Sequence, residues 1–198
     1  MVEKTFKNAN IEGNLRTMKN EMMKFLGFIP LLFLIFIPHS VGKTQTVYSF
    51  EVQKITGQKL PLKNMEGRPL LIVNIATKCG FTPQLKALQA LNKQFEPKGL
   101  IILGVPSNDF GGQTPEENKE VKKFCQDSYG VTFPLTSKMI VSGVKKHSLF
   151  QFLTKAEGEI SWNFEKFLID RKGNLVKRFR SGQNPLGKDL INSLEKLF

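Results

Sequence analysis

The chain has 198 residues, of which 40% are hydrophobic and 23% are charged, which suits one ordinary globular domain with an extension. Two cysteines exclude a disulfide framework, and two histidines, His39 and His147, are too few and too far apart in the sequence for a metal site. The formal net charge is +12, but the lysines are dispersed and no nucleic-acid motif accompanies them. We therefore predict a solvated basic surface, no nucleic-acid partner and no metal.

The first 42 residues have the pattern of a targeting segment. Residues 1–24 are polar and partly basic, and residues 25–38 are almost wholly apolar, which is typical of a secretory signal. Ser40-Val41-Gly42 offers small residues for cleavage after Gly42. The apolar run is short for a transmembrane helix and contains prolines, yet an uncleaved anchor at residues 25–38 is the alternative. We predict a signal peptide or N-terminal membrane anchor at 1–42 and an exported domain at 43–198.

The first half of this domain has the pattern of a hairpin followed by a βαβ unit. Residues 47–52 and 60–62 are expected to pair as a hairpin across a Thr-Gly-Gln turn. Residues 70–76 form an apolar run typical of a buried parallel strand. The next helix carries apolar residues at helical spacing up to Phe95, and Gly99 closes it. Residues 100–105 complete the unit as a second buried strand.

Cys79 follows the first of these strands, in the turn that enters the helix. Thr82 suits the helix N-cap and Pro83 the first helical position, so free amides and the helix dipole favour a thiolate at Cys79. Lys78 adds a neighbouring cation that would tune this thiolate. An inert buried cysteine is the alternative. Thr82 stands where a Cys-x-x-Cys motif needs its second cysteine, which disfavours a simple dithiol exchange enzyme.

The second half continues with a loop, a helix and a hairpin. The irregular loop 106–114 leaves the carboxyl end of a strand and should therefore lie beside Cys79. Thr114 to Glu117 has the pattern of a capping box, and the following helix should reach Tyr129 with Cys125 on its apolar side. The remaining expected elements are an extended piece at 131–135, a short helix at 147–154, strands at 164–169 and 175–179, and an amphipathic helix near the C-terminus.

Three motifs in order resemble those of the glutathione peroxidase family. They are Asn74-Ile75-Ala76-Thr77-Lys78-Cys79-Gly80-Phe81-Thr82, Asn108-Asp109-Phe110-Gly111-Gly112-Gln113, and Trp162-Asn163-Phe164 with Lys166-Phe167-Leu168. The similarity extends from about Thr46 to the C-terminus. It implies an α/β thioredoxin-like fold in which helices flank a central mixed β-sheet.

The same resemblance implies a catalytic tetrad of Cys79, Gln113, Trp162 and Asn163. The two amides and the indole N–H can donate hydrogen bonds to a thiolate or to a departing oxygen anion. Without the resemblance, Trp162 would be interpreted as a core residue and Gln113 as a loop residue. The implied activity is a thiol-dependent peroxidase without a cofactor. It reduces hydrogen peroxide and organic or lipid hydroperoxides through a Cys79 sulfenic acid, with glutathione or a thioredoxin-type protein as reductant.

Cys125 is the one other cysteine and therefore the one candidate for a resolving cysteine. The family's resolving cysteine aligns with Gln126, so Cys125 is either a resolver that needs local helix unwinding or a core cysteine. Ser107 and Asp109 also depart from the family pattern and inherit no role. The segment between His147 and Trp162 lacks the insertion of tetrameric members, which implies a monomer with an open site.

Two further expectations concern location and partners. The motif phrasing resembles bacterial members, which points to the periplasm, and the basic surface would suit approach to an anionic membrane. Two rival functions remain open. One is a peroxide sensor that relays oxidation to a partner protein, and the other is a thiol–disulfide exchange protein.

Overall fold

A mixed four-stranded sheet forms the centre of the molecule. The computed structural model describes residues 45–198, and in it the strand order is β4-β3-β5-β6. The strands are β3 (Leu70–Ile75), β4 (Ile101–Pro106), β5 (Lys166–Ile169) and β6 (Leu175–Phe179). β3 pairs with β4 in parallel, whereas β5 is antiparallel to both β3 and β6. The predicted fold class is confirmed.

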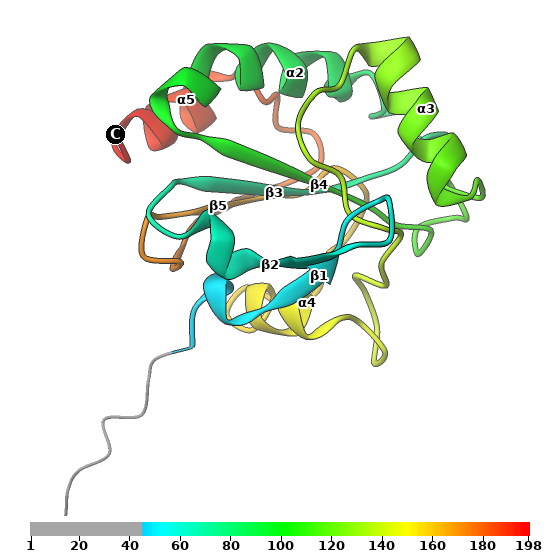
Figure 1. Ribbon diagram of the computed structural model, residues 1–198, viewed down its shortest axis with the longest axis horizontal. Helices are drawn as coiled ribbons and strands as arrows, with labels where there is room; N and C mark the ends of the chain where they lie inside the picture. Colours follow the sequence, from blue (N-terminus) through cyan, green and yellow to red (C-terminus); the bar gives the residue numbers. More distant parts are fainter. Residues whose placement is uncertain (1–44) are drawn as a thin grey trace, which may run out of the picture. The chain divides into compact units, whose positions relative to one another are not determined.

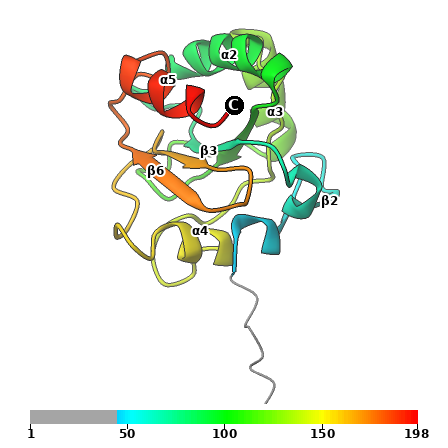
Figure 2. The same cartoon turned by 90° about the vertical axis from the view of Figure 1, so that its left-hand side faces the viewer.

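Helices and a small hairpin cover the two faces of this sheet (Figure 1). On one face lie the helices α2 (Gln84–Phe95), α3 (Asn118–Tyr129) and α5 (Lys188–Glu195). On the other lie α4 (Ser148–Leu153) and the hairpin of β1 (Glu51–Gln53) and β2 (Lys59–Pro61). Within residues 45–198, three short 3₁₀ helices complete the set: η1 (Val47–Ser49), η2 (Leu62–Met65) and η3 (Glu96–Lys98). Figure 2 shows α2 and α5 on one side of β3 and β6, with α4 on the opposite side.

Each face of the sheet has its own apolar core, because successive side chains of a strand point to opposite sides. In β3, Leu71 and Val73 pack into the core beneath α2, α3 and α5, whereas Leu70 and Ile72 pack into the core beside α4 and the hairpin. All six residues of β3 are buried, as a strand covered on both faces requires. The rigid strands β3 and β4 therefore fix the loops that leave their carboxyl ends.

Most of the expected elements are present, but several begin at other residues than expected. Residues 47–49 form the 3₁₀ helix η1 in place of the start of a strand. The helix α3 begins at Asn118, so the capping box predicted at Thr114–Glu117 is wrong. The N–H of Thr114, which the box would offer to the side chain of Glu117, donates instead to the Oδ1 of Asn108 at 2.8 Å. The extended piece expected at 131–135 makes only isolated bridges, at Leu135 and Thr136.

Some predictions lie outside the described residues. These are the signal peptide or anchor at residues 1–42 and the interpretation of His39. Within residues 45–198, no helix is both long enough and apolar enough to span a membrane.

Candidate active site

Cys79 lies in a tight loop that follows β3. The loop is closed by Thr82, whose hydroxyl accepts a hydrogen bond from the N–H of Cys79 at 3.0 Å and donates one to the carbonyl of Ala76 at 2.9 Å. Thr82 is therefore occupied within the loop and does not cap α2, which corrects the predicted N-cap. The N–H of Phe81 points at the sulfur, 3.4 Å away, and Cys79 is 7% exposed. An amide of the turn thus reaches the sulfur, as the sequence predicts.

The loop after β4 brings Gln113 to the same place. The carbonyl of Gln113 accepts hydrogen bonds from the N–H groups of Thr77 and Lys78, at 3.2 and 2.9 Å. These contacts tie the Gln113 loop to the residues that precede Cys79. The prediction that loop 106–114 lies beside Cys79 is confirmed, because parallel strands end at the same edge of the sheet.

Glu116 strengthens this junction, which the sequence alone did not reveal. Its carboxylate accepts a hydrogen bond from the Thr77 hydroxyl at 2.6 Å and lies 3.2 Å from the Lys78 ammonium. Partial burial would raise the pKa of Glu116, but the bonds from Thr77 and Lys78 outweigh it and hold the pKa below its usual value. The cation expected to tune Cys79 is therefore shared with a carboxylate, and tuning by Lys78 stays a prediction.

Trp162 and Asn163 reach the site because of the direction of β5. This strand is antiparallel to β3, and Lys166 lies opposite Val73, so the residues before β5 arrive where β3 ends. The Nδ2 of Asn163 donates to the Oε1 of Gln113 at 2.9 Å. Asn163 is buried, whereas Trp162 is 38% exposed and packs on Phe110 with ring centroids 5.9 Å apart. The structure thus gathers all four predicted tetrad residues at one edge of the sheet.

This arrangement leaves specific donors free for chemistry. Because Asn163 donates to the carbonyl oxygen of the Gln113 amide, the N–H₂ end of Gln113 stays available as a donor. The indole N–H of Trp162 is a second donor. The amide of Asn163 was expected to donate to the sulfur or to the departing oxygen, but in the structure it donates to Gln113. The catalytic roles of these residues stay predictions.

A buried ion pair holds the segment that precedes β5. The Nε of Arg178 donates to Glu165 at 2.5 Å, and both side chains are fully buried. The guanidinium also donates to the carbonyls of Gly158 and Glu159, and Glu165 accepts from the N–H and hydroxyl of Ser161. Burial would raise the pKa of Glu165, but the bonds from Arg178 and Ser161 outweigh it and lower the pKa. Sequence reasoning missed this pair, whose members are 13 residues apart.

Cys125 lies on α3 and faces the apolar core, as predicted. It is fully buried, and this burial raises the pKa of its thiol to about 12. The neighbouring Gln126 is exposed. A protonated thiol in the core is a poor nucleophile, so a resolving role would require α3 to unwind locally. That role stays a prediction.

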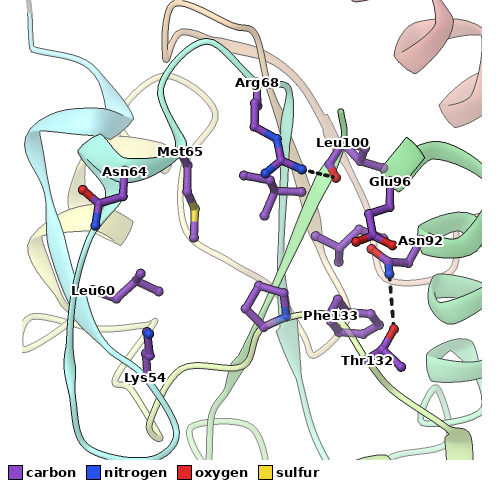
Figure 3. Close-up of a pocket in the computed structure, with 13 residues that line it drawn as sticks. Lys54, Leu60, Asn64, Met65, Arg68, Asn92, Glu96, Leu100, Thr132 and Phe133 are labelled. Atoms are coloured by element: carbon purple, nitrogen blue, oxygen red, sulfur yellow. Dashed lines mark hydrogen bonds between the residues drawn. The ribbon is translucent and has the colours of Figure 1, made fainter. Parts of the chain in front are cut away.

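Two other features lie apart from Cys79. His147 caps α4, where its Nδ1 accepts from the N–H of Leu149 at 3.2 Å, and burial lowers its pKa. In residues 45–198 no three side chains of metal-binding type gather closely enough to hold an ion. A pocket of about 340 Å³ is lined by Arg68, which precedes β3, and by Ile101 and Ile102 at the start of β4. Figure 3 shows Arg68 and other residues of its lining. Because β3 and β4 are parallel and Cys79 follows the last residue of β3, this pocket and Cys79 lie at opposite ends of the two strands.

Comparison with known proteins gives a consistent result. The family model "Glutathione peroxidase" matches residues 47–154. The "Hydroperoxy fatty acid reductase gpx1" of Synechocystis sp. is 44% identical over 163 residues, covering 77% of this chain and 95% of the relative. The "Glutathione peroxidase homolog BsaA" of Bacillus subtilis is 44% identical over 159 residues, covering 76% and 99%.

Solved structures show the same fold. The apo crystal structure of Trgpx aligns with a TM-score of 0.62 and 30% identity, covering 77% of this chain and 97% of that one. A thiol:disulfide interchange protein from Chlorobium tepidum, of the thioredoxin family, aligns with a TM-score of 0.60 at 16% identity, which shows the fold alone.

Proposed function

Because the chain belongs to the glutathione peroxidase family and is therefore a thiol-dependent peroxidase, we propose that Cys79 is the residue that reacts with the hydroperoxide. The observation that carries this proposal is the convergence of Gln113, Trp162 and Asn163 on the loop that holds Cys79. An amide N–H₂ and an indole N–H at the edge of the sheet can stabilise negative charge on sulfur and on the leaving oxygen.

The proposed reaction has two halves. The Cys79 thiolate attacks one peroxide oxygen, the O–O bond breaks, and the other oxygen leaves as an alkoxide or hydroxide that takes up a proton. Sulfur gives up two electrons and becomes a sulfenic acid. One thiol then displaces water to form a disulfide with Cys79, and a second thiol attacks that disulfide and restores the free Cys79.

The substrates that we propose are hydrogen peroxide and organic hydroperoxides, including those of fatty acids. The name of the Synechocystis relative specifies a fatty acid substrate. In this chain Trp162 is partly exposed and packs on Phe110, so an apolar surface lies at the rim of the site. An acyl chain could bury part of that surface while its hydroperoxide reaches Cys79.

The reductant that we propose is glutathione or a thioredoxin-type protein. Direct reduction by glutathione needs Cys79 alone. Reduction by a thioredoxin-type protein through an internal disulfide needs Cys125, whose thiol is buried and protonated in this fold. The structure favours the first route unless α3 opens during the cycle.

Location and assembly belong to the same proposal. Residues 1–42 have the pattern of a signal peptide or, alternatively, of an anchor at 25–38, so we propose export, to the periplasm in a bacterial source. A net charge of +12 favours approach to anionic membranes. The short connection between α4 and Trp162 favours a monomer. Cell fractionation and light scattering test these points, and a cytosolic or tetrameric protein would contradict them.

The experiment that tests the function is NADPH-coupled turnover of the full chain with hydrogen peroxide. Glutathione with its reductase and thioredoxin with its reductase are supplied in parallel, for the wild type, Cys79→Ser and Cys125→Ser. We expect Cys79→Ser to be inactive with both reductants. Retained activity in that variant would contradict the proposal, and a selective loss of the thioredoxin-driven rate in Cys125→Ser would identify a resolving cysteine. A wild type that forms one stable mixed disulfide without turnover would indicate a sensor, and rapid insulin reduction would indicate an exchange protein.

A further inference from the structure

Asn74 is the one polar residue in the apolar run of β3, and it is fully buried. It is the last residue but one of the strand and precedes Cys79 by five positions. A buried amide must find hydrogen-bond partners, because an unsatisfied polar group in the core is costly. The partners of Asn74 therefore indicate why an amide stands in this position.

All of these partners lie in the turn of residues 162–165, which we call the Trp162 turn. The side-chain Nδ2 of Asn74 donates to the carbonyl of Trp162 at 3.1 Å, and its Oδ1 accepts from the N–H of Glu165 at 2.9 Å. The main chain of Asn74 accepts from the N–H of Phe164 at 2.7 Å and donates to the carbonyl of Glu165 at 3.3 Å. One residue thus binds both the first and the last residue of the turn.

The Trp162 turn has a backbone conformation that needs such support. Phe164 has a φ of 65°, and among the described residues it is the one non-glycine residue with a positive φ. L-residues with bulky side chains rarely adopt this left-handed region, and they persist there only where the surroundings hold them. The bonds from Asn74 on either side of Phe164 supply that constraint.

We propose that Asn74 is a positioning residue for peroxide reduction. It ties the turn that carries Trp162 and Asn163 to the strand that carries Cys79, so that the hydrogen-bond donors and the sulfur keep a fixed geometry. This inference rests on the proposed function, since the donors matter only if Cys79 is the reacting group. A displacement of about 1 Å at a reacting centre can lower a rate on the order of 100-fold.

The test replaces Asn74 by aspartate, which has the same shape but presents an oxygen to the carbonyl of Trp162. The matched control is Asn92→Asp on α2. Asn92 is also buried, and its Nδ2 lies 3.4 Å from the hydroxyl of Thr132 in the pocket at the other end of the sheet (Figure 3). We measure the second-order rate constant of the full chain with hydrogen peroxide and the fluorescence of Trp162, the only tryptophan in the sequence.

We expect Asn74→Asp to lower the rate constant at least tenfold and to change the Trp162 emission, while Asn92→Asp stays within twofold of the wild type. A positioning role also requires that Asn74→Asp and Trp162→Phe combine non-additively, because both act through the same donor. Asn74→Ala provides a second variant without the introduced charge, and thermal melts establish that each variant is folded.

Several results would overturn the proposal. One is a folded Asn74→Asp or Asn74→Ala variant with a rate within twofold of the wild type. Another is full additivity with Trp162→Phe. Failure of both Asn74 variants to fold, where Asn92→Asp folds, would assign Asn74 to the fold and not to the site. An inactive wild type would instead refute the proposed function, so the two failures are distinguishable.

Discussion

The buried ion pair of Glu165 and Arg178 supports the sharpest prediction about stability. We consider Glu165→Gln, which keeps the size of the side chain and removes its charge. Both partners are fully buried, so the variant leaves the guanidinium of Arg178 without its counter-ion in the core. Breaking a buried pair in this way costs about 3–5 kcal/mol. Arg178 keeps its bonds to the carbonyls of Gly158 and Glu159, so we expect about 3 kcal/mol.

A loss of about 3 kcal/mol is a large part of the roughly 5–15 kcal/mol that stabilises a typical domain. It corresponds to a fall in Tm of roughly 6–12 °C for a chain of this size. The assay is urea unfolding followed by circular dichroism. The control is Glu66→Gln, which removes an exposed pair with Lys63 at 2.6 Å and should cost less than about 1 kcal/mol. If Glu165→Gln proves no more costly than Glu66→Gln, the reasoning about the buried pair is refuted.

The same variant has a pH signature. The pKa of Glu165 is lowered in the folded protein, so its contribution to stability is complete above the pKa of the unfolded chain, about 4.3. That contribution is lost as the pH falls through the lower, folded value. We therefore expect the stability difference between wild type and Glu165→Gln to shrink below about pH 4. A difference that is constant from pH 7 to pH 3 would contradict the cause assigned here.

Three further predictions concern other parts of the chain. Gly104→Ala should cost about 1–3 kcal/mol in urea unfolding, because its Cβ would lie 2.6 Å from Leu135, and a neutral change would contradict the packing. Burial raises the pKa of Cys125 to about 12, so the contribution of this thiol to the free energy of unfolding is complete below about pH 8.5 and is lost as the pH rises. Relative to Cys125→Ala, the wild type should lose about 2 kcal/mol of stability by pH 10. Parallel pH profiles of the two proteins would contradict the burial of the thiol. Glu116→Gln should lower the peroxide rate constant by less than about tenfold, since the amide oxygen still accepts from Thr77, and stopped-flow kinetics would reveal a larger loss.

The sequence predicts the sheet and its covering helices well because burial dictates their patterns. The apolar runs 70–76 and 100–105 are typical of strands that are covered on both faces, and the strands expected at 164–169 and 175–179 are close enough in the sequence to pair as the hairpin of β5 and β6. Local patterns failed where a polar group found a partner in the surrounding loops. Glu117 fits a capping box with Thr114 by spacing, but the N–H of Thr114 donates to the side chain of Asn108.

In the candidate site, too, some residues are predictable from local sequence patterns and others are not. Cys79 is predictable from its place between a buried strand and a helix, whereas Gln113, Trp162 and Asn163 were identified by resemblance alone. Gln113 lies near Cys79 because β3 and β4 are parallel, whereas Trp162 and Asn163 arrive there through the antiparallel pairing of β5 with β3, which no local pattern specifies. The one local signal for the support of the Trp162 turn was a single amide, Asn74, in an otherwise apolar strand.

Trapping of the oxidised sulfur identifies the cysteine that reacts with the peroxide. The full chain is treated with one equivalent of hydrogen peroxide in the presence of dimedone, which labels sulfenic acids, and the labelled peptides are identified by mass spectrometry. We predict a label on Cys79 at the first time point, and none on Cys125, whose thiol is buried and protonated. A label that forms first on Cys125, or an unlabelled Cys79 after the peroxide is consumed, would contradict the account.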